Sequence, residues 1–185
     1  MPPVTGRNGY PVCYPSMKLI LIRHGKAEDR ETIAEGGNDD ALRSLTPEGR
    51  RKMKAAARGL RKLYPKIDLL ATSPLARAVQ TAEIVYKAYG DTPQFIELDL
   101  LAGDTPPENL IAWLKDHDLG AAAVAMVGHE PSLGRWIGFF TTGGEKSFVA
   151  MKKGAVCVID FPGPPAAGNG VLVGLFQSGD LRKIG

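Results

Sequence analysis

The sequence predicts an α/β fold: a three-layer α/β/α sandwich with a mostly parallel sheet. Short apolar runs alternate with longer segments whose apolar residues recur at helical spacing, which is the pattern of parallel strands joined by helices. Residues 121–127 include no polar residue, as expected of a strand that is buried on both faces in the middle of such a sheet.

The first strand and the first helix are indicated by an apolar run and by capping residues. Residues 18–22 form the run, and the polar segment 26–45 that follows predicts a loop. Thr46 and Pro47 are suited to be the N-cap and the first helical residue. An apolar stripe then recurs every three or four residues until Pro65, which ends the helix.

The same alternation continues to the C-terminal region. Ser73-Pro74 predicts a second helix start, and Thr105–Glu108 has the pattern of a capping box that opens a third helix running to about His117. Strands are expected at 67–71, 94–98 and 121–127, a further helix at 131–140, and an edge hairpin at 155–160 and 171–176.

Length and composition indicate one globular domain, which we place at residues 17–185 after an irregular N-terminal extension, residues 1–16. The chain has 185 residues and a net charge of +3, which is too weakly basic to predict a nucleic-acid partner. Arg50, Lys54 and their basic neighbours are expected to lie on the solvated face of one helix. We expect a cytoplasmic protein, because there is neither an apolar h-region nor a membrane-length apolar run.

The two cysteines do not suggest a disulfide framework or a metal cluster. Cys157 lies within an apolar run and is expected to be a small core residue, whereas Cys13 lies in the N-terminal extension. We therefore predict no metal and no other cofactor.

Residues suited to phosphate chemistry follow several of the predicted strands. Arg23, His24 and Gly25 follow the first strand, Arg77 lies one turn into the helix after the second, and His129 follows the fourth. The carboxyl ends of parallel strands meet at one edge of a sheet, where ligands usually bind. Each residue alone would more often be structural, but their convergence predicts a phosphate-binding site.

Three segments resemble the signatures of the histidine phosphatase superfamily, which has a phosphoglycerate mutase-like fold. They are Leu-Ile-Arg-His-Gly (21–25), Ser-Pro-Leu-Ala-Arg-Ala-Val-Gln-Thr-Ala (73–82) and Val-Gly-His-Glu-Pro-Ser (127–132). Their order and spacing match the family from about Met17 to the C-terminus. The small size of the chain is most similar to the SixA-type phosphohistidine phosphatases.

The resemblance implies a role for each matching residue. His24 is the nucleophile that becomes phosphorylated, Arg23 and Arg77 hold the phosphoryl oxygens, and His129 completes the pocket. If protonated, His129 would add a third positive charge. Such a site stabilises the charge on the phosphoryl oxygens by position and by fixed cations, and it needs His24 as a neutral imidazole.

The proton donor to the leaving group is less clearly indicated. Larger relatives use a carboxylate in the corresponding region, where this chain has Asp99 as the first choice and Asp104 or Glu97 as alternatives. These could equally be surface carboxylates of a loop. A phosphohistidine substrate needs less help, because imidazole departs more readily than an alkoxide.

The sequence thus predicts a metal-independent phosphatase that works through a phosphohistidine intermediate. A phosphohistidine-bearing protein is the expected partner, since the chain has little room for an insertion that covers the pocket and the acidic loop 26–45 could repel small polyanions. The alternatives are a small-molecule phosphomonoesterase of the same superfamily and a noncatalytic phosphate-binding adaptor. A mutase is disfavoured because it needs a closed pocket that excludes water. Neither nucleic acid nor a membrane is expected as partner.

Overall fold

A six-stranded mixed sheet runs through the molecule in the order β3-β2-β4-β1-β5-β6. The computed structural model describes residues 16–29, 39–117, 119 and 122–185, so the predicted extension, apart from Ser16, lies outside the described residues. The first four strands are parallel, while β5 and β6 pair antiparallel at one side, as the hairpin prediction required. The strands are β1 (Met17–Arg23), β2 (Leu69–Thr72), β3 (Gln94–Glu97), β4 (Ala123–Gly128), β5 (Val156–Phe161) and β6 (Val171–Phe176).

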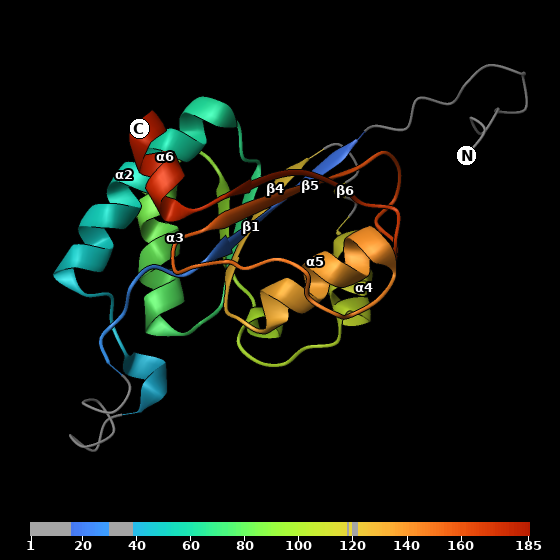
Figure 1. Cartoon of the computed structure of the whole chain (residues 1–185), viewed down its shortest axis with the longest axis horizontal. Coiled ribbons are helices and arrows are strands. Elements are labelled where there is room, and N and C mark those ends of the chain that lie inside the picture. Colours follow the sequence, from blue (N-terminus) through green and yellow to red (C-terminus); the bar gives the residue numbers. More distant parts are fainter. Residues whose placement is uncertain (1–15, 30–38, 118, 120–121) are drawn as a thin grey trace, which may run out of the picture.

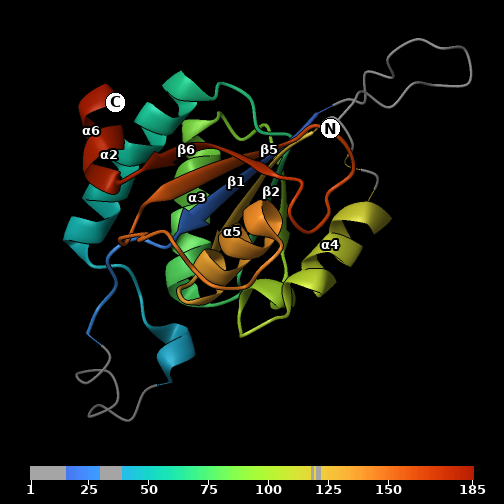
Figure 2. The same ribbon diagram turned by 45° about the vertical axis from the view of Figure 1, so that its right-hand side comes forward.

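Helices cover both faces of this sheet and complete the predicted sandwich (Figures 1 and 2). One face is covered by α2, α3 and α6 and the other by α4 and α5. The helices are α2 (Pro47–Leu63), α3 (Ala76–Ala88), α4 (Pro107–Asp116), α5 (Ser132–Thr142) and α6 (Ser178–Ile184), with 3₁₀ turns η1 (Asp40–Leu42) and η2 (Asp99–Leu101). Within the described residues, no helix is both long and apolar enough to cross a membrane.

Strand β1 shows why the sheet lies between two cores. Leu19 and Leu21 pack into the core under α4 and α5, whereas Ile20 and Ile22 pack into the core under α2, α3 and α6. Successive side chains of a strand point to opposite faces, so a continuous apolar run is required where both faces are covered. Cys157 of β5 is fully buried among apolar neighbours, as expected.

The helix starts predicted from the sequence are confirmed only in part by the structure. Thr46 caps α2, with its side chain accepting a hydrogen bond from the Gly49 amide at 3.0 Å. The predicted capping box at Thr105–Glu108 is wrong, because Pro106 occupies the N-cap and no side chain caps the helix. Helix α3 begins at Ala76 instead of directly after Ser73-Pro74. Sequence analysis did not identify the short C-terminal helix α6.

The strand order brings the functional segments together. β4 lies between β1 and β2, with Arg23 opposite Gly128 and Thr72 opposite Val127. The residues that follow these three strands therefore lie at one edge of the sheet. β3 lies on the outer side of β2, so the segment after it begins farther from β1.

Candidate active site

A pocket of about 470 Å³ lies at the carboxyl edge of the sheet and joins the four residues that the sequence motifs singled out. Arg23 and His24 come from the end of β1, Arg77 from the first turn of α3, and His129 from the end of β4. The pocket is also lined by Asp40, Arg43, Ala102, Gly103, Asp104, Glu130, Pro131, Ser132 and Lys153.

The His24 imidazole is oriented by a hydrogen bond to its neighbour's backbone. Its Nδ1 lies 2.7 Å from the Gly25 carbonyl oxygen. A carbonyl only accepts, so Nδ1 carries the proton and Nε2 keeps its lone pair. Burial, followed by the positive groups around it, lowers the pKa of His24 to about 3. His24 is thus a neutral imidazole at neutral pH, with the nitrogen opposite the hydrogen bond available to react.

The backbone around His24 is fixed on three sides. The His24 amide donates to the Gly128 carbonyl at 3.1 Å, and the Gly25 amide donates to the Thr81 hydroxyl at 3.0 Å. A Cβ at Gly25 would lie 2.6 Å from Cγ of Met53, so glycine lets α2 pack directly under the nucleophile loop. These contacts leave the imidazole little freedom to shift.

His129 faces His24 across the pocket, with ring centroids 5.0 Å apart. Its Nε2 lies 2.9 Å from the Ser73 hydroxyl oxygen. Burial, together with the nearby arginines, lowers the pKa of His129 to about 4. The condition for a third positive charge, a protonated His129, is therefore not met in the free pocket at neutral pH, where His129 offers a neutral ring to a ligand.

The Arg23 side chain is anchored by a hydrogen bond to a backbone carbonyl group. One terminal nitrogen donates to the Met151 carbonyl oxygen at 2.5 Å, while its Nε is buried with no hydrogen-bond partner among the described residues. Buried donors are almost always paired in folded proteins. A tetrahedral oxyanion in the pocket would supply the acceptors that this guanidinium lacks.

The Arg77 guanidinium is held in place by Asp40, which lies in the 3₁₀ turn η1 before α2. It donates to the Asp40 carbonyl oxygen at 2.8 Å and forms an ion pair with the Asp40 carboxylate at 3.1 Å. Arg43 contacts the same carboxylate at 3.0 Å. Asp40 was predicted only as one member of an acidic loop. No sequence pattern near Asp40 predicted this role, because the role arises from a tertiary contact between η1 and α3. Two further acidic residues of the loop 26–45, Glu31 and Glu35, lie outside the described residues.

The three candidate proton donors are placed differently. Asp99 and Glu97 do not line the pocket, whereas Asp104 does. The reason is topological: β3 is an edge strand, and only after η2 does the chain return to the pocket, where the Ser132 hydroxyl donates to the Gly103 carbonyl at 3.0 Å. Asp104 forms an ion pair with Arg135, and its side chain is 70% exposed.

The pocket is suited to an anion. Its side chains include three arginines and a lysine, whose positive charges attract an anion. Among the described residues no group of three or more His, Cys, Asp and Glu side chains could hold a metal. Guanidinium groups instead match the planar, bidentate demands of phosphate.

Known proteins are similar to this chain in sequence or in fold. An uncharacterized protein of Picosynechococcus sp. strain PCC 7002 is 35% identical over 145 residues, which covers 76% of this chain and 82% of that protein. The protein histidine phosphatase SixA, solved with tungstate, superposes with a TM-score of 0.75 at 23% identity, covering 89% of this chain and 99% of that one.

The phosphoglycerate mutase of Bacillus anthracis superposes with a TM-score of 0.65 at 13% identity, over 93% of this chain and 98% of that one. The fold is thus phosphoglycerate mutase-like. The family model of the histidine phosphatase superfamily (branch 1) matches residues 19–102, which include both Arg23-His24-Gly25 and Arg77. The chain belongs to the histidine phosphatase superfamily and is SixA-like in structure.

Proposed function

We propose that this protein is a metal-independent phosphatase in which Nε2 of His24 accepts the phosphoryl group, and that its substrate is phosphohistidine on a partner protein. The observation that carries the proposal is the His24 imidazole. Its Nδ1 donates to Gly25 and its pKa is about 3, so the nitrogen lone pair is available throughout the physiological range. Arg23 and Arg77 line the same pocket.

The reaction has two steps. In the first, the Nε2 lone pair of His24 attacks phosphorus, a nitrogen–phosphorus bond forms, and the bond to the substrate imidazole breaks. The departing imidazole nitrogen takes a proton from water. In the second, a water that gives a proton to the hydroxide left by the first step attacks phosphorus, and the nitrogen–phosphorus bond of His24 breaks. Phosphate leaves with the new oxygen, and the electron pair returns to Nε2. Arg23 and Arg77 hold the charged oxygens throughout.

The carboxylate arrangement supports a phosphohistidine substrate. Asp104 lines the pocket, but its carboxylate accepts a hydrogen bond from Arg135, so in this arrangement it acts as an acceptor. An alkoxide leaving group needs a positioned proton donor, whereas imidazole departs with less assistance. The likeness to SixA, a protein histidine phosphatase, supports the same substrate class.

A trapping experiment tests the nucleophile. Wild-type protein mixed with a ³²P-labelled phosphohistidine protein should acquire acid-labile, alkali-stable label and release phosphate. His24→Ala should do neither, because the attacking nitrogen is gone, while the variant should still bind tungstate if it folds. Acid-labile label on His24→Ala at the wild-type level would refute the mechanism.

A small-molecule phosphomonoesterase is the second candidate, and one observation favours it. Asp104 is a carboxylate at the pocket edge, where it could protonate an alkoxide if it were released from Arg135. Comparing kcat/KM on a phosphohistidine protein with a panel of small phosphate esters separates the two functions. Asp104→Asn should lower turnover of esters selectively if esters are the substrates.

A further inference from the structure

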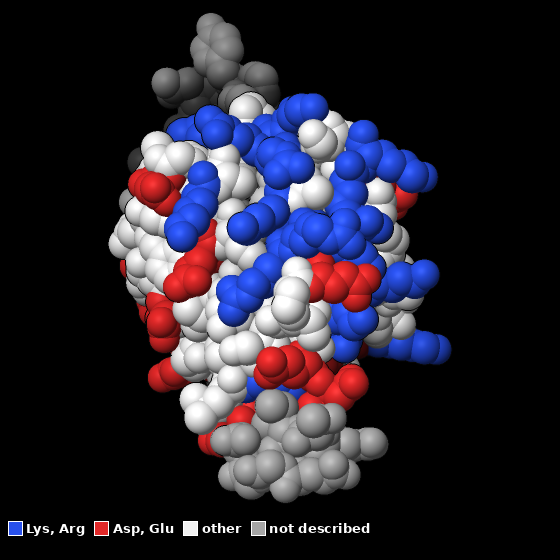
Figure 3. Space-filling model, turned by 90° about the vertical axis from the view of Figure 1, so that its left-hand side faces the viewer, with Lys and Arg blue, Asp and Glu red and all other residues white. Residues whose placement is uncertain are grey.

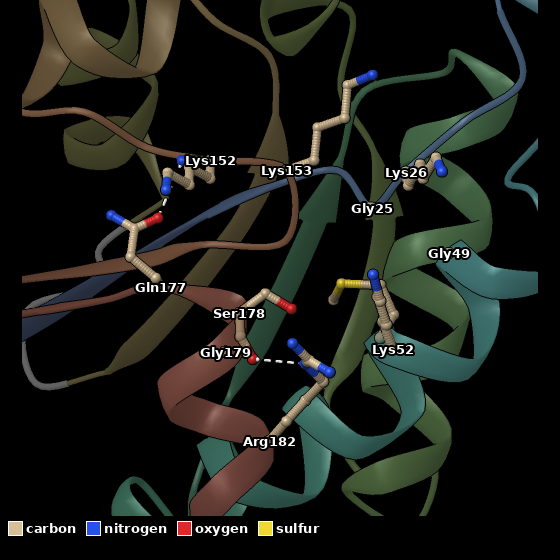
Figure 4. Close-up of a pocket in the computed structure, with 11 residues that line it drawn as sticks. Gly25, Lys26, Gly49, Lys52, Lys152, Lys153, Gln177, Ser178, Gly179 and Arg182 are labelled. Atoms are coloured by element: carbon tan, nitrogen blue, oxygen red, sulfur yellow. Dashed lines mark hydrogen bonds between the residues drawn. The ribbon is translucent and has the colours of Figure 1, made fainter.

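A second pocket adjoins the catalytic one and is strongly cationic (Figure 4). It measures about 380 Å³ and its lining includes five basic side chains and no acidic one. The basic residues come from four separate segments of the chain: Lys26, Lys52, Lys152, Lys153 and Arg182. Helix α2 contributes Met53 and helix α6 contributes Ser178 to its lining.

Most of this charge is not neutralised within the described part of the molecule. Lys26 and Lys52 share the single carboxylate of Glu48, at 2.7 and 2.5 Å. No ion pair is formed by Lys152, Lys153 or Arg182 with another described residue. Like charges held together on a surface create a positive potential that attracts anions.

The cationic pocket is connected to the nucleophile. Lys153 lines both pockets, and Gly25, next to His24, lines the second. The Gly154 amide lies within hydrogen-bond distance of both the Arg23 and the His24 carbonyl oxygens, at 3.1 and 3.0 Å. The Lys152-Lys153-Gly154 turn is therefore attached to the backbone that presents His24, so an anion in the second pocket would lie beside a phosphoryl group in the first.

Beyond this pocket the basic surface continues over α2 (Figure 3). Two further hollows follow along the helix. Their basic lining residues are Arg50, Arg51, Lys52, Lys54, Arg58, Lys87 and Arg182, and Glu83 is their one acidic lining residue. Lys and Arg side chains thus gather on this face (Figure 3), although the whole chain carries a net charge of only +3. We call the surface formed by these two hollows and the cationic pocket the α2–α6 basic face.

We propose that the α2–α6 basic face binds an acidic surface of the phosphohistidine protein while its phosphohistidine enters the catalytic pocket. This inference rests on the proposed function. The face spans three neighbouring hollows, which is more than one small anion fills. The lining of the three hollows includes no aromatic side chain on which a nucleic-acid base could stack. An acidic polypeptide matches both the extent and the sign of the charge.

Paired peptides test this docking. Two peptides of about 20 residues, centred on phosphohistidine, reach roughly 33 Å to either side when extended. One has Asp and Glu in its flanks and the other has Asn and Gln at the same positions. The wild-type protein should hydrolyse the acidic peptide with a kcat/KM about tenfold higher, and the advantage should fall as salt is raised.

Charge-reversal variants test whether the α2–α6 basic face causes the higher kcat/KM on the acidic peptide. Lys152→Glu/Arg182→Glu changes two residues of the cationic pocket that do not line the catalytic pocket. The double variant should lose the advantage for the acidic peptide and keep its kcat/KM for phosphoramidate within about twofold. Lys66→Glu/Lys115→Glu makes the same charge change at the opposite edge of the sheet, before β2 and at the end of α4, and should retain the advantage.

The outcomes separate the two proposals. If the wild-type protein hydrolyses neither peptide, the proposed substrate class is wrong and the docking inference is wrong with it. If it hydrolyses both peptides equally, or if the charge reversal lowers phosphoramidate turnover as much as acidic-peptide turnover, docking is overturned while the phosphatase function stands. Inhibition by a single-stranded oligonucleotide that exceeds inhibition by polyglutamate would assign the face to nucleic acid instead.

Discussion

His24 and His129 are two neutral imidazoles placed among arginines. Burial is the largest cause of the lowered pKa of each, and the neighbouring guanidinium groups act in the same direction. Positive charge around a nucleophile has two effects here: it attracts the phosphate and it disfavours protonation of the nitrogen that must attack. In the proposed mechanism, the same arginines therefore serve both phosphate binding and nucleophile activation.

Titration of the ring nitrogens tests this arrangement. In ¹⁵N NMR spectra of the native protein, His24 and His129 should show no titration between pH 5 and pH 8, whereas imidazoles of the urea-unfolded chain should titrate near pH 6.5. Because the pKa of His24 is lower in the folded state, the unfolded chain binds more protons below about pH 6.5. The free energy of unfolding should then fall by about 1.4 kcal/mol per pH unit from this imidazole as pH drops from 6.5 toward 3.

A matched variant separates His24 from other groups. His24→Gln removes the titrating ring, so urea unfolding between pH 7 and pH 5 should show a smaller loss of stability than in the wild type. A native His24 resonance that titrates near pH 6.5 would contradict the buried, neutral state.

Sequence motifs alone predicted which four residues would meet, but not how each is held. Arg23, His24, Arg77 and His129 belong to local motifs at strand and helix ends, so their convergence follows from a parallel sheet. The protonation of His129 depends on burial, which a sequence does not display. Asp40 and Lys153 reach the pocket from loops, and loop positions depend on tertiary contacts.

At the scale of elements, the first turn of α2 supports the loop that follows His24. The Lys26 carbonyl accepts a hydrogen bond from the Thr46 amide at 3.0 Å. A Cβ on Gly49 would lie 2.0 Å from the same carbonyl oxygen. The first turn of α2 thus packs directly against the backbone two residues beyond His24.

Two substitutions at this helix start should have different effects. Thr46→Ala removes the cap and should cost about 1 kcal/mol, or roughly 2–4 °C in Tm, with little change in kcat. Gly49→Ala should lower Tm further and also reduce kcat/KM, because the new methyl group must displace Lys26. Differential scanning calorimetry and turnover assays measure both, with Gly163→Ala, which meets nothing within 4 Å, as the control. Unchanged turnover in a folded Gly49→Ala protein would show that the loop does not depend on α2.

Elements with strong local signals were predicted well, and weak ones were not. The long apolar stripe and Thr46-Pro47 identified α2, whereas α6 has only seven residues, too few for a periodic pattern. The Thr105 capping box was wrong because two prolines follow it and Pro106 takes the capping position with an extended backbone. Short elements are decided by what they pack against.

At the scale of the molecule, α6 completes the core under α2 and α3. Leu181 is fully buried there, and a Cβ on Gly59 would lie 2.0 Å from the Leu181 carbonyl oxygen, so the two helices are in close contact. The last turn of the chain therefore belongs to the core and also supplies Arg182 to the α2–α6 basic face.

Leu181→Ala tests this integration. Removing its side chain should lower the free energy of unfolding by about 2–5 kcal/mol in urea titrations, while kcat on phosphoramidate at 25 °C stays close to that of the wild type. Leu172→Ala on β6, at an exposed position, should cost much less. Equal losses in the two variants would mean that α6 is not part of the cooperative core.

The position of β1 has a consequence for how the protein is made. Ile20 pairs with Ala125 on one side and Val158 on the other, so the strand that ends at the nucleophile is synthesised early and finds its partners late. While the ribosome is still translating β5, β1 can pair only with β4, and contacts this distant in sequence form slowly. A nascent chain that ends before β5 would contain every residue that lines the catalytic pocket, but the strand that presents His24 would lack its neighbour on one side.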